Sequence, residues 1–247
     1  MMERRRLFFA KFALVFLAPY TVASSRAAAQ QPDIGSVVRG VDASVQGRID
    51  RLAGYSVTEH YAVFRGKDDT HPAAEMLVKT TYTKQTGKSY EIVSQSGSSL
   101  WRNEVLLTLL DHEKRMSQPG NVQTALIDSA NYEIKLDANP RDRLNDRDCL
   151  VLDITPRRNS EYLFKGRLWV DAQDFAIVQL KGTASKSAFF LASAAEVSRQ
   201  YDEMDALPMA THAEAVSGSA LLGQTTVKID YSNYQLQLIP DRQAQVK

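Results

Sequence analysis

Cysteine and histidine, which often bind metals or carry nucleophilic chemistry, are scarce in this sequence. The one cysteine, Cys149, lies in the strand-like run CLVLDI and has no partner for an internal disulfide. A lone cysteine in such a run is usually a small buried apolar residue. The four histidines have neither the i, i+4 nor the HxH spacing of zinc sites, so we predict no metal site. They are expected at the surface and are His60, His71, His112 and His212.

Motifs for catalysis and nucleotide binding are also missing. The run SQSGSSL lacks the second glycine of a GxSxG nucleophile elbow, and there is no phosphate loop or dinucleotide fingerprint. Asp68 and Asp69 lie in a predicted loop, without the context of a glycosidase pair. No segment carries the basic stripe of a nucleic-acid-binding protein. We therefore expect no enzyme, no catalytic residues, no cofactor and no nucleic-acid partner.

The first 29 residues have the layout of a secretory signal peptide. Three arginines precede an apolar run from Leu7 to Pro19, and Ala27 and Ala29 fit the small-x-small cleavage pattern. The apolar run is shorter than the ~20 residues that span a bilayer, although an uncut N-terminal anchor is the alternative. RRRLFF also resembles a twin-arginine signal. We predict cleavage near Ala29 and export to the periplasm by the Sec or the twin-arginine route.

The predicted mature chain suits a single domain over residues 30–240, followed by a polar tail over 241–247. Cleavage would remove five basic residues and one acidic residue, which leaves 25 basic against 28 acidic residues and a net charge of about −3. Both signs are interspersed along the chain. The cluster RDRLNDRDC is an example, and we expect it to form a solvated turn.

Hydrophobic spacing changes along the chain from a helical period to a strand period. Residues 36–53 place apolar side chains at steps of three and four, which predicts an amphipathic helix that stops at Gly54. Arg48 is assigned to the polar face of this helix. A second helix is predicted over 100–116 and a shorter one over 121–129.

Most of the remaining sequence alternates between apolar and polar residues, as half-buried strands do. In TTVKIDYSNY, for example, Val227, Ile229 and Tyr231 alternate with polar residues. About nine to eleven strands of this kind predict an antiparallel sheet with one apolar face. Such a sheet must curl, close or split to bury that face, and the helices near residues 40 and 105 are the expected covers. The predicted fold class is mainly β with α (α+β).

Four phrases spread along the chain carry a resemblance to a known family. They are LLTLLDHE in the middle helix, NYEIKL after it, GRLWVDAQDFAIVQLKG across a hairpin, and LLGQTTVKIDYSNYQ near the end. Together they resemble the outer-membrane lipoprotein-sorting superfamily, the LolA/LolB-like fold, over most of the mature chain. The resemblance implies an incomplete, strongly curved antiparallel β-barrel that is covered by helices, with a concave face that receives lipid acyl chains.

By this resemblance the site is a set of apolar positions on the concave face rather than a motif. Val178 and Leu180 are expected to share a side of their strand. The family's carriers also have an arginine that tethers the covering helices, and no arginine of this sequence is matched to it. The predicted cavity residues are Tyr132, Ile134, Tyr162, Phe164, Leu168, Val178, Val227, Ile229 and Tyr231 of the sheet, with Leu106 and Leu110 of a covering helix.

Three functions remain open from the sequence. The leading hypothesis is a soluble, monomeric periplasmic carrier or binding protein for lipoproteins or other lipids, with an inner-membrane exporter or an outer-membrane acceptor as partner. The alternative is a periplasmic sensor or interaction module of the same fold that binds a protein partner. An exported hydrolase with an unrecognised site is the third. The lack of a cysteine near the predicted cleavage site argues against a lipid-anchored LolB-type receptor.

Overall fold

The computed structural model describes residues 32–184, 195–219 and 223–240. The predicted signal peptide and the predicted polar tail lie outside these ranges. Within them, no helix is both long enough and apolar enough to cross a membrane.

A long first helix and a chain of short helical segments make up the helical part of the fold. The first helix begins where the side chain of Asp33 accepts a hydrogen bond from the backbone N–H of Ser36 (2.9 Å). It ends at Arg51 because the chain turns directly into a strand, so Gly54 lies in that strand and is not the helix stop that we predicted. The segments are α1 (Ile34–Arg51), α2 (Ser99–Trp101), the π-helical η1 (Arg102–Leu106), α3 (Leu107–Met116), α4 (Pro119–Val122) and the 3₁₀ turn η2 (Gln123–Ala125).

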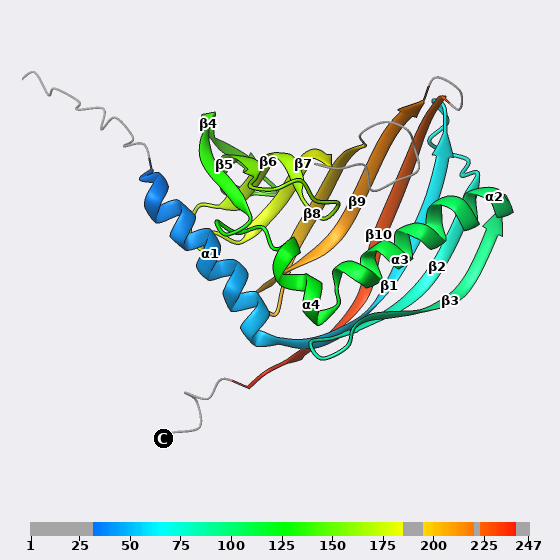
Figure 1. The fold of residues 1–247 in the computed structure, drawn as a ribbon, viewed down its shortest axis with the longest axis horizontal. Coiled ribbons are helices and arrows are strands. Elements are labelled where there is room, and N and C mark those ends of the chain that lie inside the picture. The colour runs from blue at the N-terminus through cyan, green and yellow to red at the C-terminus, as the bar shows by residue number, and fades with distance from the viewer. Residues whose placement is uncertain (1–31, 185–194, 220–222, 241–247) are drawn as a thin grey trace, which may run out of the picture. The chain divides into compact units, whose positions relative to one another are not determined.

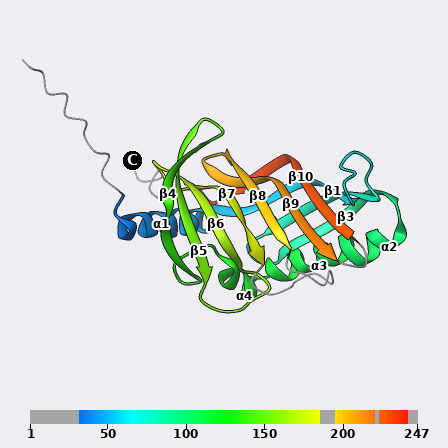
Figure 2. The same cartoon turned by 90° about the horizontal axis from the view of Figure 1, so that it is seen from above.

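Ten antiparallel strands form one sheet in the order β3-β2-β1-β10-β9-β8-β7-β6-β5-β4. The edge strands β3 and β4 do not pair with each other within the described ranges, so the sheet stays open, and Figures 1 and 2 show it curling around one face. The predicted α+β class with a curved, incomplete barrel is confirmed. The strands are β1 (Leu52–Arg65), β2 (Ala74–Thr83), β3 (Gly87–Gly97), β4 (Tyr132–Leu144), β5 (Arg147–Pro156), β6 (Phe164–Asp171), β7 (Ile177–Ala184), β8 (Glu196–Met204), β9 (Leu207–Ser219) and β10 (Gly223–Leu238).

The strand order explains why helices cover the concave face. β1 to β3 form one meander and β4 to β10 form another, and the pairing of β1 with β10 joins them. The chain between β3 and β4 must therefore travel from one edge of the sheet to the other. It does so as the helical segment that runs from α2 to η2, which crosses the concave face (Figure 1).

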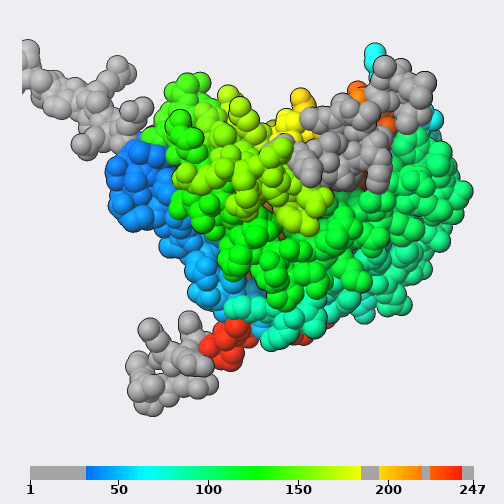
Figure 3. Space-filling view, in the orientation of Figure 1, coloured from blue at the N-terminus to red at the C-terminus, as the bar shows by residue number. Residues whose placement is uncertain are grey.

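The two main helices cover different halves of that face. The apolar stripe of α1, including Val37 and Val41, packs on the cluster formed by β4 to β7. The stripe of α3 and η1, including Leu106 and Leu110, packs on β1, β2 and β10. Figures 1 and 2 agree on this arrangement, and Figure 3 shows the blue atoms of α1 at the left of the molecule, with green atoms of later elements to their right.

The acidic and basic cluster RDRLNDRDC forms the end of the β4–β5 hairpin. Asn145 and Asp146 both have positive φ (48° and 62°) and lie between the paired residues Leu144 and Arg147. Asparagine and aspartate tolerate this left-handed backbone better than other non-glycine residues. Both turn residues are exposed, so the predicted solvated turn is confirmed.

Candidate functional site

A cavity of about 250 Å³ lies between α1, the segment 116–127 and the concave face of the sheet; we call it the larger cavity. Its volume is close to the lower end of the ~300–1,000 Å³ of ligand pockets. Both meanders contribute to its wall, so it forms only in the assembled sheet. Its apolar lining consists of Val45, Ile49, Met116, Val122, Ala125, Leu126, Ile127, Phe164, Ile177, Leu180, Val197, Pro208, Met209 and Ala210.

Seven tyrosines also line the larger cavity and add phenol groups to its wall. Burial raises the pKa of Tyr132 to about 12, and it raises the pKa of Tyr231 well above its ordinary value. These phenols are therefore protonated at neutral pH and can donate hydrogen bonds. The seven are Tyr55, Tyr82, Tyr132, Tyr162, Tyr201, Tyr231 and Tyr234.

A second cavity of about 70 Å³, the smaller cavity, lies beneath α3. It shares Met116, Phe164, Val197 and Arg199 with the larger cavity, so the two are immediate neighbours. Leu109 of α3 forms part of its wall on the helix side. Together the two cavities extend the hollow from α1 to the underside of α3.

Charged side chains are buried beside these cavities. Lys88 of β3 contacts Glu113 of α3 (Nζ–Oε2 2.6 Å) and lies 3.5 Å from a carboxylate oxygen of Glu59 on β1. Arg199 of β8 lies 3.6 Å from the other carboxylate oxygen of Glu113. Glu59 and Glu113 are only 1% and 3% exposed, so they depend on these cations for compensation. We call these four residues the charge network.

Burial and ion pairing shift the pKa values of Lys88 and Glu113 in opposite directions. Burial lowers the pKa of Lys88, but Glu113 and Glu59 outweigh it, and the pKa lies well above its ordinary value. Burial raises the pKa of Glu113, but Lys88 and Arg199 outweigh it and lower that pKa. Lys88 and Glu113 are therefore both charged at neutral pH. Tyr61, which is also buried, donates a hydrogen bond to Glu59 (2.5 Å).

His112 of α3 is buried, and its predicted position at the surface is wrong. It is 8% exposed, its ring lies 5.3 Å from that of Tyr162, and its Nδ1 lies 3.7 Å from the Glu161 carboxylate. Burial lowers the pKa of His112, against the opposing effect of Glu161. The imidazole is therefore neutral at neutral pH. The other three histidines are exposed or half-buried and are His60, His71 and His212.

The structure brings six of the predicted cavity residues to the two cavities. Tyr162 does so from the turn before β6, since that strand begins only at Phe164. The larger cavity is lined by Tyr132, Tyr162, Phe164 and Tyr231. The smaller cavity is lined by Phe164, Val227 and Ile229.

Four further predicted residues lie in the core that supports the cavities. Leu106 and Leu110 belong to the apolar cluster under α3. Ile134 and Leu168 belong to the cluster under α1. In the described part of the chain, none of the four is among the lining residues of either cavity, so their contribution is to hold the helices and strands in place.

Val178 lies on the opposite face of the sheet from Leu180, so the expectation that they share a side is wrong. Val178 packs with Cys149 and Trp169, whereas Leu180 packs in the cluster under α1. The β6–β7 register shifts next to Trp169, which is a β-bulge. The bulge brings Ile177 to the concave face beside Leu180 and turns Val178 away. Cys149 is buried, as predicted.

The charged residues beside the cavities were not predicted from the sequence, although their spacing placed them on the apolar faces of their strands and helix. Glu59 falls in phase with Val57 and Tyr61 on β1, and Arg199 falls in phase with the apolar residues of β8. Glu113 continues the stripe of Leu106 and Leu110 at helical steps. A charged residue at a position that faces the apolar side of its strand or helix was the sign of a buried charge. Side chains alternate across a strand and recur every three or four residues on a helix, so these positions can be identified from the sequence.

The assignment of Arg48 to the polar face of its helix is wrong, because this side chain lines the larger cavity. It borders the apolar stripe, three residues after Val45. Its Nε donates a hydrogen bond to the backbone carbonyl of Pro208 (3.0 Å), and a terminal nitrogen lies 3.7 Å from the sulfur of Met209. The side chain therefore extends along the cavity wall.

Burial of apolar groups and hydrogen bonding by phenols are the main interactions that this wall offers. No group of three or more His, Cys, Asp or Glu side chains within residues 32–184, 195–219 and 223–240 is placed to hold a metal ion. The site is a largely apolar cavity with phenol and cationic side chains in its wall.

No protein-family model and no curated protein matches this chain. Solved structures are similar to it. A LolA superfamily protein from Nitrosomonas europaea is 13% identical, with 84% of this chain and 95% of that chain covered and a TM-score of 0.39. A domain assigned to outer-membrane lipoprotein sorting from Vibrio parahaemolyticus is 11% identical, with 81% and 92% covered and a TM-score of 0.42.

The MucA/MucB complex of Pseudomonas aeruginosa is also similar, at 8% identity, with 79% of this chain and 93% of that chain covered and a TM-score of 0.26. The lipoprotein-sorting likenesses name the same superfamily as the resemblance in the sequence. All three TM-scores are below 0.5, and no activity of those proteins follows for this chain.

Proposed function

We propose that this protein, once exported to the periplasm, binds acyl chains of a lipid or lipoprotein in the larger cavity and carries them through water. The observation that supports this most is the apolar wall of that cavity, which adjoins the smaller cavity. Burying an acyl chain contributes ~0.8 kcal/mol per methylene group, so binding needs no catalytic group. A cleaved signal peptide and one domain over residues 30–240 are part of this proposal.

Within this proposal the cargo contacts the predicted residues that line the two cavities. Phe164 is central because it borders both cavities. Tyr132 and Tyr231 add polarisable rings with hydroxyl groups to the wall of the larger cavity. Leu106 and Leu110 act indirectly, since they fasten the helical segment that covers the sheet.

A matched pair of variants tests the proposal. Ala210→Trp introduces a large ring into the wall of the larger cavity, and Ala43→Trp introduces the same ring on the exposed side of α1. We expect the unmodified protein to take up a neutral fluorescent probe, N-phenyl-1-naphthylamine, and to release it when a fatty acid is added. Ala210→Trp should abolish most of this uptake, whereas Ala43→Trp should leave it unchanged.

Native mass spectrometry after gentle purification provides an independent measurement. A co-purifying mass that fits a lipid or an acylated peptide supports the proposal. A clean apo mass, together with no uptake of the probe or of a fatty acid, overturns it.

A second candidate function, recognition of a protein partner, is favoured by the edge strand β3. Val93 and Ile92 on this strand are 57% and 37% exposed, and the strand has a free edge within the described ranges. An exposed sheet edge can accept an extended segment of another protein as an additional strand. This would be the interaction module that the sequence left open.

A charge on the edge strand distinguishes the two candidates, since charged residues discourage edge pairing. If β3 binds a protein, the native protein should co-purify as a stoichiometric complex with that partner. Val93→Lys should prevent this complex from forming, as measured by light scattering. The same variant should leave uptake of the fluorescent probe unchanged. Loss of probe uptake with an intact complex would contradict the assignment of the complex to β3.

A further inference from the structure

The charged side chains that line the larger cavity all have the same sign. They are Arg48, Lys88 and Arg199, and no aspartate or glutamate of the described residues is among the lining. A cavity whose charged lining is only cationic differs from one built only to exclude water. It attracts negative charge into an environment where Coulomb interactions are weakly screened.

Two of these cations already have partners behind the wall. Lys88 is held by Glu113 and Glu59, and Arg199 lies 3.6 Å from Glu113. Those carboxylates do not line the larger cavity, and Glu113 lines the adjoining smaller cavity, so the two cations are already compensated from there and from β1. The charge network therefore has little capacity left to attract a ligand.

Arg48 is different, because its partners are a backbone carbonyl and a thioether sulfur. Across the described ranges, no carboxylate lies within ion-pair distance of its guanidinium. The nearby acid on the same helix, Asp50, is exposed and accepts a hydrogen bond from Gln46. A half-buried guanidinium without a counter-ion is costly, and a bound anion would relieve that cost.

Arg48 also converges with Lys88 on one part of the cavity. Arg48 contacts Met209, which packs in one apolar cluster with Tyr55 and Tyr82. Lys88 is the direct neighbour of Tyr82 in the pairing of β2 with β3. Tyr55 stacks on Tyr82, with ring centroids 5.1 Å apart, and both rings line the cavity. The cationic end of the larger cavity therefore has phenol groups beside the guanidinium.

We infer that the cargo is an amphiphile with an anionic head group, a carboxylate or a phosphate, which Arg48 binds at the cationic end while the chain lies along Leu180 and Phe164. Guanidinium groups bind both kinds of anion with two parallel hydrogen bonds. The acylated cysteine of a lipoprotein carries no such charge, so free fatty acids or acidic lipids fit this site better. The inference rests on the proposed function, because it requires an acyl chain in the larger cavity.

The test compares three ligands that carry one and the same oleoyl chain. Oleate, 1-oleoyl-lysophosphatidate and neutral monooleoylglycerol each displace N-phenyl-1-naphthylamine from the full mature protein. We expect the two anions to bind about ten-fold more tightly than the neutral ligand. Raising the salt concentration should narrow that gap, and inorganic phosphate alone, which has no chain, should not displace the probe.

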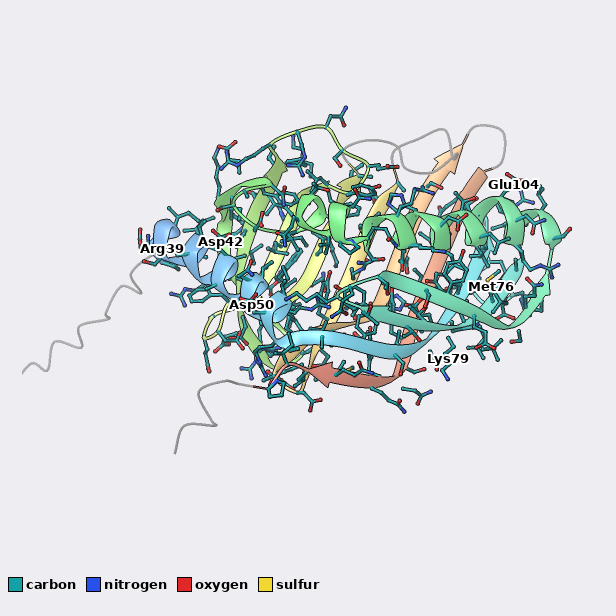
Figure 4. All side chains as sticks on the ribbon, turned by 60° about the horizontal axis from the view of Figure 1, so that its bottom comes forward. Arg39, Asp42, Asp50, Met76, Lys79 and Glu104 are labelled. Carbon is teal, nitrogen blue, oxygen red and sulfur yellow. The ribbon has the colours of Figure 1, made fainter. Side chains whose placement is uncertain are left out.

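Arg48→Gln should weaken oleate binding about ten-fold and leave monooleoylglycerol within about two-fold of its value in the native protein. Arg39→Gln is the matched control, since Arg39 is exposed near the start of the same helix and does not line the cavity (Figure 4). Thermal unfolding of both variants checks that each is folded.

The outcomes separate this inference from the proposed function. Equal affinities for the anionic and the neutral ligands, unchanged in Arg48→Gln, overturn the anion site and leave acyl-chain binding intact. Displacement by none of the oleoyl compounds overturns both. A preference for one anion over the other identifies the head group as a carboxylate or a phosphate.

Discussion

The two halves of the concave face are covered by helices in different ways. Under α1 the contact is apolar, with Val37 and Val41 packed on β4 to β7. Under α3 an equally apolar contact is joined by Glu113, which reaches the buried cation of Lys88. The helix α1 is therefore held by apolar packing and a few hydrogen bonds. The helix α3 is held by apolar packing and, in addition, by the buried Lys88–Glu113 ion pair.

This difference shows what each half contributes to the cavity. Apolar packing contains no titratable group, so the contact under α1 depends less on pH than the contact under α3. Ion pairs out of water are stable only when complete, because removal of one partner leaves an uncompensated buried charge. The position of α3 therefore depends on every member of the charge network.

Lys88→Met should have the largest effect on this comparison. It keeps an unbranched apolar stem and removes the cation, which leaves two buried carboxylates with Arg199 as the remaining cation beside them. We expect the free energy of unfolding to fall by about 3 kcal/mol or more, measured by urea denaturation. Lys135→Met is the control, because the Lys135–Glu133 pair is mostly exposed and screened by water, so its loss should change the free energy of unfolding little. Equal losses in the two variants would show that burial of the network is irrelevant.

Gly40→Ala tests the packing under α1 in the same way. A Cβ at this position would lie 2.3 Å from the ring of Phe175, which occupies the turn between β6 and β7. We expect a loss of about 1–3 kcal/mol from overpacking, measured by the same urea titration. Gly47→Ala has open space around its Cβ and should gain about 0.5–1 kcal/mol from helix propensity. A gain in both variants would mean that α1 does not rest on the hairpin.

Asp42→Ala should have a smaller effect on the same helix. The carboxylate of Asp42 accepts hydrogen bonds from the backbone N–H (2.8 Å) and the hydroxyl (2.6 Å) of Ser129, which lies just before β4. Their loss should cost about 1–2 kcal/mol in thermal or urea unfolding. Asp50, also labelled in Figure 4, accepts its hydrogen bond among the described residues from exposed Gln46, and Asp50→Ala should change stability by less than about 0.5 kcal/mol. Matching losses would contradict a specific role for the Ser129 contact.

His112→Gln should produce the smallest effect, and only in acid. Because the folded-state pKa of His112 is lowered, its contribution to stability is complete above the unfolded value of 6.5 and is lost as pH falls through the folded value. Glu161, Glu113, Arg115, Arg199 and the ring of Tyr162 surround this imidazole.

The native protein should therefore lose stability between pH 7 and pH 5, as measured by urea denaturation at both values. This loss should shrink in His112→Gln and remain in the control His71→Gln, since His71 is exposed. An undiminished loss in His112→Gln would assign the acid sensitivity to other groups.

Much of the fold could be predicted from side-chain periodicity. The alternation around Val227, Ile229 and Tyr231 correctly placed these residues on the concave face, because their strand is regular there. Val178 could not be placed, because a bulge that shifts the phase of β7 leaves no mark in the alternation itself. This one β-bulge thus placed the side chain of Val178 on the opposite face of the sheet from the one predicted.

The polar part of the site was less accessible to sequence reasoning for a physical reason. Charged residues are usually solvated, so Arg48 was assigned to the wet face of its helix. Glu59 and Arg199 lie at apolar phases, yet their burial depends on partners that are distant in sequence. Only the folded sheet brings β1, β3, β8 and α3 close enough for these charges to compensate one another.

The helical segment between β3 and β4 connects the two edge strands of the sheet across its concave face. Widening the hollow would move those edges apart, and the connecting chain would have to lengthen by unwinding its short helices. The size to which the hollow can widen is therefore limited by the length of this helical segment, independently of how well the walls match a ligand.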